Sequence, residues 1–473
     1  MDLSCDVVAL IEELRREIAE LRAENLALKQ EVADLRRQLG KNSSNSSKPP
    51  SSDGLAKKPR IGGSLRGKSG KTSGGQPGHQ GGTLRPVPTP DKIERHEATQ
   101  CQHCQATLAP AMATAVRTRQ VFDMPEPRLE VTEHQAQIYT CACCHGVTRA
   151  AFPADIAAPV QYGPRIKAAA IYLNAQQLVP EDRVGEIMHD LFGAGLLCPA
   201  SIAAWSASKA REWAPVEAQI AALVAAAPVR HLDETGFRVG GKTQWLHTAS
   251  TAALTHYRVT QKRGALPDTL HGGIIVHDHF KPYFTLAGVE HALCNAHHLR
   301  ELKALIDIER EPWAGRMSRV LTRAAERVRR AVAHGRTGLA AGCARRVLSV
   351  YDAIIRRGLA FHDAQPALPR SPGARGRSPK RIGHNLLARL RDYKTEVLRF
   401  MFDFTVPFTN NQAEQDIRMM KVKMKISGGF RTQPGAATFA TLRTVLCTAR
   451  KQGANILQTL TATPDTLVQA LSG

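Results

Sequence analysis

Two acidic residues of this 473-residue chain stand inside runs that otherwise have the composition of buried strands. Asp233 lies in the middle of the run 229–239, and Asp278 ends the apolar run 272–278. Burying a carboxylate is unfavourable unless a partner compensates its charge, so an acid at such a position indicates a purpose. Together the two acids predict a site where carboxylates hold divalent cations.

A third acid, Glu414, follows later in the chain. The run 409–418 is typical of a helix start, with asparagine capping the helix and Glu414 in its first turns. Arg418 follows four residues later on the same face, where it would either steady Glu414 or contact a phosphate. Three convergent carboxylates can bind two Mg²⁺ (or Mn²⁺) ions about 3.5–4 Å apart, which is the chemistry of phosphodiester hydrolysis and strand transfer.

Other polar residues near these acids are assigned lesser roles. Glu234 follows Asp233 directly, so in a strand it points to the opposite face, and we expect an exposed acid that is not a ligand. Cys294, His297 and Arg300 would share one helical face near the site, and we expect His297 and Arg300 to support it. A zinc site at Cys294 and His297 would lack two further ligands and is not expected.

Basic residues flank the third acid. They could form a solvated helix face, but their place beside Glu414 favours contact with DNA phosphates. The residues are Lys421, Lys423, Lys425 and Arg431.

Two Cys-x-x-Cys pairs predict a separate metal site. About 36 residues lie between the pairs, and strand-like sequence at 128–139 precedes the second. Four thiolates suit a structural, tetrahedral Zn²⁺ with no open position, although Cys143 and His145 are competing ligands and unliganded thiols are the alternative. No glycine follows the first pair, so we expect its turn to be less tight. The four expected ligands are Cys101, Cys104, Cys141 and Cys144.

Strands and helices must position these residues. The run 229–239 is followed by strand-like runs at 244–250 and 255–260, which predicts a three-stranded meander. The separation of Asp278 from Glu414 leaves room for a helical segment, and the sequence from Leu299 to about Arg357 favours helix throughout. Helices are also predicted at 162–177, at 180–192 and from Ser201 onward. The last two would form either a DNA-reading helix-turn-helix or part of an ordinary bundle.

The first forty residues carry a heptad repeat. Apolar residues alternate at spacings of four and three, with Asn25 at one core position, which predicts a coiled coil and a homo-oligomer. The alternative is one amphipathic helix packed on its own protein. The apolar residues are Val7, Ile11, Leu14, Ile18, Leu21, Leu28, Val32, Leu35 and Leu39.

Composition indicates a polyanionic partner. The 64 Lys and Arg residues outnumber the 42 Asp and Glu residues, giving a net charge of +22, and such an excess favours nucleic acid. The Gly-, Ser-, Pro- and Lys-rich stretch from residue 41 to about 90 is expected to be disordered, either as a basic arm on DNA or as a solvated linker.

No apolar run approaches the roughly 20 residues of a membrane span, and the acidic start does not look like a signal peptide. We therefore expect a cytoplasmic, DNA-associated bacterial protein that does not bind membranes.

The order of these motifs resembles the insertion sequence 66 family of transposases. The heptad is followed by Asn45-Ser-Ser-Lys-Pro-Pro-Ser-Ser-Asp53, Gly74-Gly-Gln-Pro-Gly-His79 and the paired cysteines, and then by His231-Leu-Asp-Glu-Thr235, Asn410-Asn-Gln-Ala-Glu414 and Lys425-Ile-Ser-Gly-Gly-Phe-Arg431. The resemblance implies an RNase H-like catalytic core in which Asp233, Asp278 and Glu414 are the DDE triad. It also implies a helical insertion between the second and third acids.

The expected protein is thus a multidomain α/β transposase. It would bind the terminal repeats of its element and the target DNA, aided by helper proteins of the same element, and would cleave and join strands with two Mg²⁺ ions. The alternatives are a non-catalytic DNA-binding regulator and a degenerate transposase. The expected domains are a coiled coil (1–40), a basic linker (41–92), a zinc-binding β domain (93–155), a helical region (156–228), a catalytic domain (229–440) with an insertion at about 299–400, and a helical tail (441–473).

Overall fold

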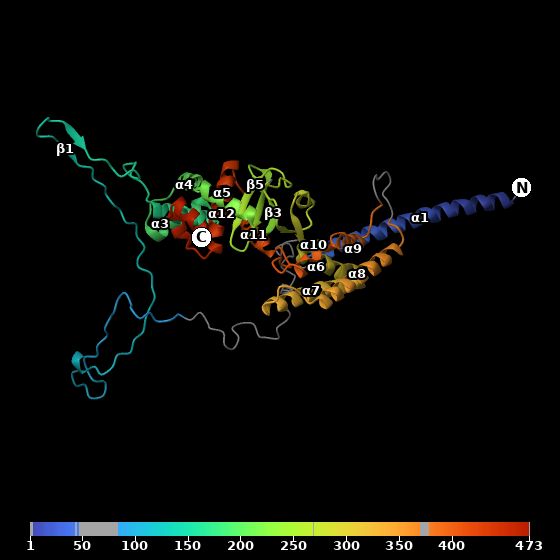
Figure 1. Cartoon of the computed structure of the whole chain (residues 1–473), viewed down its shortest axis with the longest axis horizontal. Helices are drawn as coiled ribbons and strands as arrows, with labels where there is room; N and C mark the ends of the chain where they lie inside the picture. Colours follow the sequence, from blue (N-terminus) through green and yellow to red (C-terminus); the bar gives the residue numbers. More distant parts are fainter. Residues whose placement is uncertain (1–2, 43–44, 47–83, 268, 369–377, 473) are drawn as a thin grey trace. The chain divides into compact units, whose positions relative to one another are not determined.

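The computed structural model describes residues 3–42, 45–46, 84–267, 269–368 and 378–472 (Figure 1). Most of the expected basic linker, residues 47–83, lies outside the described residues. The chain divides into two compact units, and each is considered by itself. As far as their residues are described, one unit comprises Met1–Leu65, Phe152–Ile187 and Leu196–Gly473, and the other comprises Arg66–Ala151 and Met188–Gly195.

Helix α1 (Leu3–Gly40) contains the heptad. Its apolar stripe faces solvent, with exposed fractions from 43% at Ile11 to 80% at Leu39. Near the end of the helix, Leu28 and Val32 line a pocket together with Ile308, and Arg37 pairs with Glu309. The described part of the chain leaves the rest of the stripe exposed, as a helix that pairs with another chain requires. The coiled coil itself stays a prediction.

The smaller unit contains little regular structure. The short 3₁₀ turn η2 (Pro110–Met112) precedes a hairpin of β1 (Ile138–Thr140) and β2 (Val147–Arg149), which pair antiparallel around the second cysteine pair. The strand expected at 128–139 is therefore wrong for most of its length. A strand needs a paired neighbour, and only the three residues of β2 supply one to this segment.

A five-stranded mixed sheet forms the centre of the larger unit. The order is β5-β4-β3-β6-β7, in which β3 (Val229–Val239), β4 (Lys242–Ser250) and β5 (Thr255–Thr260) form the predicted antiparallel meander. Gly240 and Gly241 make the two-residue turn between β3 and β4, and both have positive φ, which favours glycine. Parallel to β3 run β6 (Ile274–His277) and β7 (Glu290–Leu293), the second of which the sequence did not predict.

The register of β3 and β6 sets the two aspartates side by side. Val229 pairs with Ile274 and His231 with Val276 in the parallel ladder. Continuing this register by two residues brings Asp233 level with Asp278, just beyond the last paired residues. The acids of two adjacent parallel strands therefore lie at the same edge of the sheet.

Helices cover both faces of the sheet (Figure 1). On one face, α5 (Ala214–Ala226) packs Val216, Ile220 and Val224 into a cluster with Leu232 of β3. On the other, α11 (Asn411–Ser427) packs Ile417 and Met420 against Phe237. Alternate residues of β3 thus enter two different buried layers.

The remaining helices flank this core. Before β3 lie α2 (Pro164–Ile171), the π-helical η3 (Tyr172–Gln176), α3 (Glu181–Phe192) and α4 (Pro199–Glu212), which confirms the helices expected there. Between β6 and β7 lies the 3₁₀ helix η4 (Lys281–Thr285). After α11 follow α12 (Gln433–Lys451), α13 (Ile456–Thr461) and α14 (Pro464–Ser472).

Helices between the second and third acids build a second core, as expected for an insertion. They bury residues such as Trp313, Tyr351 and Phe400 in one cluster. The elements are α6 (Asn295–Ala304), the π-helical η5 (Leu305–Glu309), α7 (Pro312–Ala333), α8 (Ala341–Asp363), α9 (Ile382–Asp392), α10 (Lys394–Leu398) and the 3₁₀ helix η6 (Arg399–Met401).

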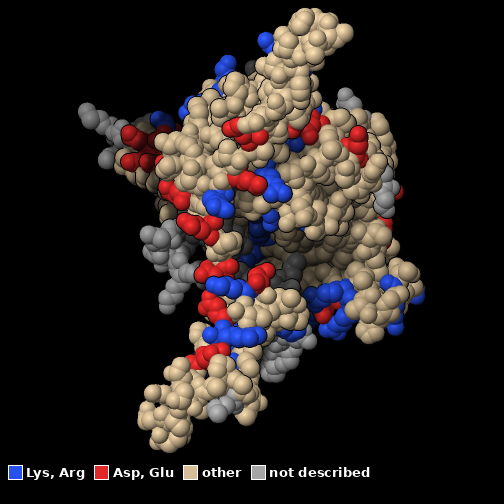
Figure 2. All heavy atoms as spheres, turned by 90° about the vertical axis from the view of Figure 1, so that its left-hand side faces the viewer, with Lys and Arg blue, Asp and Glu red and all other residues tan. Residues whose placement is uncertain are grey.

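Figure 2 shows how the charged side chains are arranged on one face of the molecule. On the face drawn in Figure 2, Lys and Arg side chains are interspersed with Asp and Glu and do not form one continuous basic patch. No helix among the described residues is both long and apolar enough to cross a membrane.

Candidate active site and zinc finger

The three predicted acids come from three elements at one edge of the sheet. Asp233 lies within β3, Asp278 directly follows β6 and Glu414 stands in the first turn of α11, and all three side chains are partly buried. Burial raises the pKa of Asp233 to about 8, and the charges of Glu234, Asp278 and Glu414 act in the same direction. The backbone N–H of Glu234 donates to Asp233 Oδ1 at 2.9 Å and partly opposes this shift. Several carboxylates therefore share one small region.

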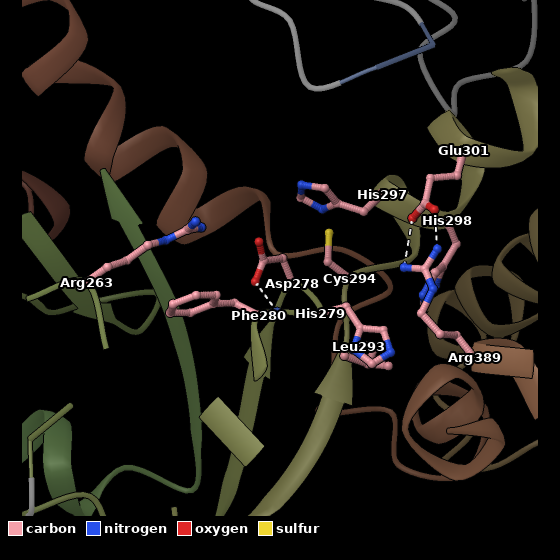
Figure 3. A pocket seen from close by; sticks show the side chains of 10 residues that line it. All are labelled: Arg263, Asp278, His279, Phe280, Leu293, Cys294, His297, His298, Glu301 and Arg389. Carbon is pink, nitrogen blue, oxygen red and sulfur yellow. Dashed lines mark hydrogen bonds and ion pairs between the residues drawn. The ribbon is translucent and has the colours of Figure 1, made fainter. Parts of the chain in front are cut away.

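Asp278 opens onto a cavity of about 230 Å³ (Figure 3). Its Oδ1 accepts the backbone N–H of Phe280 at 2.9 Å, which fixes the turn into η4. Cys294 and His297 line the cavity with Asp278, and Arg389 and Glu301 form an ion pair on its far side in Figure 3. The cavity thus combines an acid with thiol, imidazole and guanidinium groups.

Residues of α6 hold Glu414. Arg300 donates to Glu414 Oε2 at 3.3 Å, while His297 Nδ1 lies 3.8 Å and Cys294 Sγ 3.9 Å from Oε1. His297 and Arg300 are therefore beside the third acid, as expected of supporting residues. Arg418 is exposed and forms no ion pair among the described residues, so its role beside Glu414, whether as support or as a phosphate contact, stays a prediction.

The three acids do not close into a compact ligand set. Among the described residues, the one group of three whose ligand atoms all lie within 4.8 Å of one another is Cys294, His297 and Glu414. Glu414 is therefore turned toward α6. Two cations about 3.5–4 Å apart can join carboxylates that do not touch each other, so this spacing is compatible with a two-ion site.

Glu234 is not the exposed acid that the strand alternation predicted. Its side chain is 1% exposed, and it accepts hydrogen bonds from the Tyr283 hydroxyl and from Arg263 at 2.7 and 2.9 Å. Alternation correctly places it on the face opposite Asp233. That face is covered by η4 and α5, so the side chain is buried and needs the charged partner that Arg263 supplies.

Asn410 connects the acid-bearing elements. It precedes α11, but its side chain does not cap that helix as expected. Instead its Nδ2 donates to the Leu232 carbonyl at 2.7 Å, and its Oδ1 lies 2.8 Å from His231 Nδ1. Its backbone N–H donates to Cys294 Sγ at 3.1 Å. This buried residue thereby joins β3, the end of β7 and the start of α11 within a few residues of Asp233 and Glu414.

The predicted basic run of α11 divides into two faces. Arg418, Lys421 and Lys425 are exposed at spacings of three and four residues, and Arg431 is exposed after the helix. Lys423 is only 6% exposed, and its Nζ lies 5.0 Å from the ring centre of Phe430. The expectation that Lys423 contacts DNA is therefore wrong, because its position on α11 points toward the core.

Each Cys-x-x-Cys pair of the smaller unit forms the same knuckle. Cys101 N donates to the Ala106 carbonyl at 2.8 Å and Cys141 N to the Gly146 carbonyl at 2.9 Å. Gln105 and His145 both adopt positive φ (60° and 56°), so the first turn is as tight as the second despite its lack of glycine.

The knuckles favour thiolate sulfur. Backbone N–H groups of Cys104 and His103 lower the pKa of Cys101, and those of Cys144 and Cys143 lower the pKa of Cys141. The four sulfur atoms do not form one compact group among the described residues. The donor chemistry nevertheless fits Zn²⁺, since two knuckles with two thiolates each supply a complete tetrahedral set.

The carboxylate region likewise fits a divalent cation. Burial is the main cause of the raised pKa of Asp233, and the neighbouring negative charges add to it. A cation held by Asp233, Asp278 and Glu414 would relieve this repulsion with the oxygen ligands that Mg²⁺ prefers.

Several residues of the site escaped prediction from the sequence. Asn410 was assigned to a helix cap, Tyr283 and Arg263 were not noticed, and Glu234 was placed in solvent. The signal for Glu234 was its position next to Asp233 in a strand, but only the packing of η4 shows that it is buried.

Comparison with protein families gives three matches. The model described as Transposase IS66 family matches residues 159–438, and the zinc-finger binding domain of transposase IS66 matches residues 98–145. A family of unknown function matches residues 5–85. No curated protein matches the chain. The first match contains all three acids of the sheet edge, and the second contains Cys101, Cys104, Cys141 and Cys144.

Proposed function

The chain belongs to the IS66 family of transposases, and we propose that it binds the terminal repeats of an insertion sequence and catalyses metal-dependent cleavage and transfer of DNA strands. The observation that carries this proposal is the convergence of Asp233, Asp278 and Glu414 at one edge of the sheet. The register of β3 and β6 brings Asp233 level with Asp278, and Glu414 stands in the first turn of α11, which packs against β3. All three lie within the segment that the transposase family model matches.

We take the five-stranded core to be RNase H-like. Its support is the mixed sheet, in which an antiparallel meander is extended by two parallel strands and covered by helices on both faces. This arrangement delivers two acids from the neighbouring strands β3 and β6 and a third from α11, which packs on β3 and β4. The domain boundaries given above are proposed on the same basis.

Asp233, Asp278 and Glu414 would hold two Mg²⁺ ions, which supply an activated attacking oxygen and stabilise the leaving oxygen when bound. Arg300 and His297 would position Glu414 from α6. Arg418, Lys421 and Lys425 would bind phosphates along the exposed face of α11, with Arg431 beyond it. No covalent bond between the enzyme and DNA is needed.

The other parts of the chain would organise the DNA. The zinc finger and the basic arm would add DNA contacts, and α1 would join chains as a coiled coil so that two element ends can be held together. Proteins encoded by the same element are possible helpers.

The test is strand cleavage on DNA that carries the ends flanking this gene. Wild type, Asp233→Asn and the control Asp352→Asn, which removes a remote surface acid of α8, are compared with Mg²⁺ or Mn²⁺ and with EDTA. We expect metal-dependent nicking at the element ends by wild type and control, and its loss in Asp233→Asn with DNA binding retained. Binding without cleavage by any of the three, even with helper proteins, would instead favour a regulator or a degenerate transposase.

A further inference from the structure

Cys294, His297 and Glu414 form a cluster of three metal-ligating side chains from two elements. Cys294 precedes α6, His297 lies one turn later and Glu414 stands on α11. Their ligand atoms all lie within 4.8 Å of one another. The sequence offered only two of these ligands, because Glu414 is about 120 residues away from the other two.

The spacing is close to that of a tetrahedral ion. A cation about 2.3 Å from sulfur and about 2.0 Å from nitrogen and oxygen has its ligands about 3.3–3.5 Å apart. His297 Nδ1 and Cys294 Sγ lie 3.8 and 3.9 Å from Glu414 Oε1. Each pair needs to close by only about 0.5 Å to reach ligand spacing.

The surroundings leave these atoms available to a cation. His297 Nδ1 is buried and has no hydrogen-bond partner among the described residues. Arg300 engages Oε2 of Glu414, so Oε1 remains directed at the other two ligands. Cys294 is 1% exposed, and burial raises the pKa of its thiol to about 11, a shift that the backbone N–H donated by Asn410 to its sulfur only partly opposes. The thiol is therefore protonated without a metal, and a cation has to displace that proton.

We propose that Cys294, His297 and Glu414 bind one thiophilic divalent cation of the zinc class. A thiolate and an imidazole select Zn²⁺, Co²⁺ or Cd²⁺ over Mg²⁺, which prefers oxygen ligands. Cys294 and His297 also line the cavity that Asp278 opens onto, so water or a phosphate oxygen in that cavity would supply the fourth ligand. Binding releases the thiol proton to solvent.

This site shares Glu414 with the proposed magnesium pair. A zinc-class ion that holds Glu414 against α6 withdraws it from Asp233 and Asp278, so the two sites exclude each other. Zinc-class ions would therefore inhibit cleavage. This consequence rests on the proposed function, whereas the binding site itself does not.

The site is tested by Co²⁺ binding to the full chain, to which one equivalent of Zn²⁺ has first been added so that only the four-thiolate site, the stronger zinc ligand set, is filled. Tetrahedral Co²⁺ with a thiolate ligand gives visible absorption and a near-ultraviolet charge-transfer band, neither of which depends on enzyme activity. We expect wild type to take up one Co²⁺ with these bands. Cys294→Ser should abolish them, and His297→Gln, on a partly exposed side chain that is less important for folding, should weaken binding about tenfold or more.

Two controls separate the alternatives. Cys343→Ser removes a thiol of α8 outside the cluster and should leave the bands unchanged. Asp233→Asn should also retain them, and excess Mg²⁺ should weaken Co²⁺ binding to wild type but much less to Asp233→Asn. Equal Co²⁺ uptake by wild type, Cys294→Ser and His297→Gln would overturn the site. If wild type shows the bands but never cleaves DNA, the proposed function fails while this site stands.

Discussion

At the scale of single residues, Asp233 and Glu234 show how one strand gives adjacent acids different environments. Both are removed from bulk water, but Glu234 is compensated by Arg263 and Tyr283, whereas Asp233 has one backbone N–H and several negative neighbours. An uncompensated carboxylate that opens toward other acids is suited to bind a cation. The compensated one stabilises the strand.

The pKa of Asp233 predicts a pH dependence of stability without magnesium. The folded-state pKa of about 8 exceeds the ordinary 3.8, so the contribution of this group is fully present below pH 4 and is lost as the pH rises through 8. We expect Asp233→Asn to be more stable than wild type by about 1–3 kcal/mol at pH 8.5, and the advantage to shrink at pH 5. Urea unfolding in magnesium-free buffer measures this, and saturating Mg²⁺ should reduce the gap. Parallel pH profiles for the two proteins would contradict it.

Glu234 predicts a structural effect. Glu234→Ala leaves the buried Tyr283 hydroxyl without its acceptor and Arg263 without its charge partner, and should lower the free energy of unfolding by about 2–3 kcal/mol. Glu212→Gln, which removes an exposed partner of Lys209, is the matched control and should change it by less than about 0.5 kcal/mol. Chemical denaturation compares the two, and equal effects would mean that Glu234 contributes no more than a surface acid.

At the scale of elements, the site depends on how α11 is fixed against the sheet. Asn410 makes two side-chain contacts to β3 and one backbone contact to Cys294, so it sets where the first turn of α11 begins. Glu414 lies one turn later. A small shift of this junction would move the third acid away from the other two.

Asn410→Ala should therefore affect both stability and activity. It leaves the Leu232 carbonyl and His231 without their buried partner, which should cost about 2–4 kcal/mol of unfolding free energy, and cleavage should fall by more than DNA affinity does. The adjacent, exposed Asn411→Ala is the control, with an effect below about 0.5 kcal/mol. Thermal unfolding measures the stability of the two variants, and cleavage assays measure their activity. An Asn410→Ala protein as stable and active as the control would show that Asn410 does not fix the start of α11.

The two faces of α11 predict different effects on DNA binding. Each lost phosphate contact reduces the slope of log K against log salt by about 0.9. Lys421→Gln and Lys425→Gln should each reduce this slope by about 0.9. Lys423→Met, on the buried face of the same helix, should leave the slope unchanged. Binding titrations at several salt concentrations test this, and an equal decrease for all three would show that Lys423 does reach DNA.

At the scale of the whole molecule, α1 carries an apolar stripe that the described chain leaves largely exposed. Leu21→Asp places a charge within that stripe, while Ala23→Asp places the same charge on the polar side of the helix. We expect wild type and Ala23→Asp to be oligomeric and Leu21→Asp to be monomeric, because a buried charge at a core position disfavours the coiled coil. Size-exclusion chromatography with light scattering reports the mass. An unchanged mass for Leu21→Asp would assign the contact between chains elsewhere.

The sequence by itself determined what local spacing can specify. The meander at 229–260, the strand before Asp278, the insertion helices and the knuckle-forming cysteine pairs follow from periodicity and turn chemistry, which act over a few residues. The order of motifs was sufficient to indicate the family.

Tertiary structure alone decided which face of each element is buried and which distant residues meet. The sequence showed that Glu234 faces away from Asp233, but not that η4 covers it. It showed that Lys423 is on α11, but not that its face meets Phe430. It also did not pair Glu414 with Cys294 and His297, since contacts across about 120 residues depend on how the helices pack on the sheet and leave no local pattern.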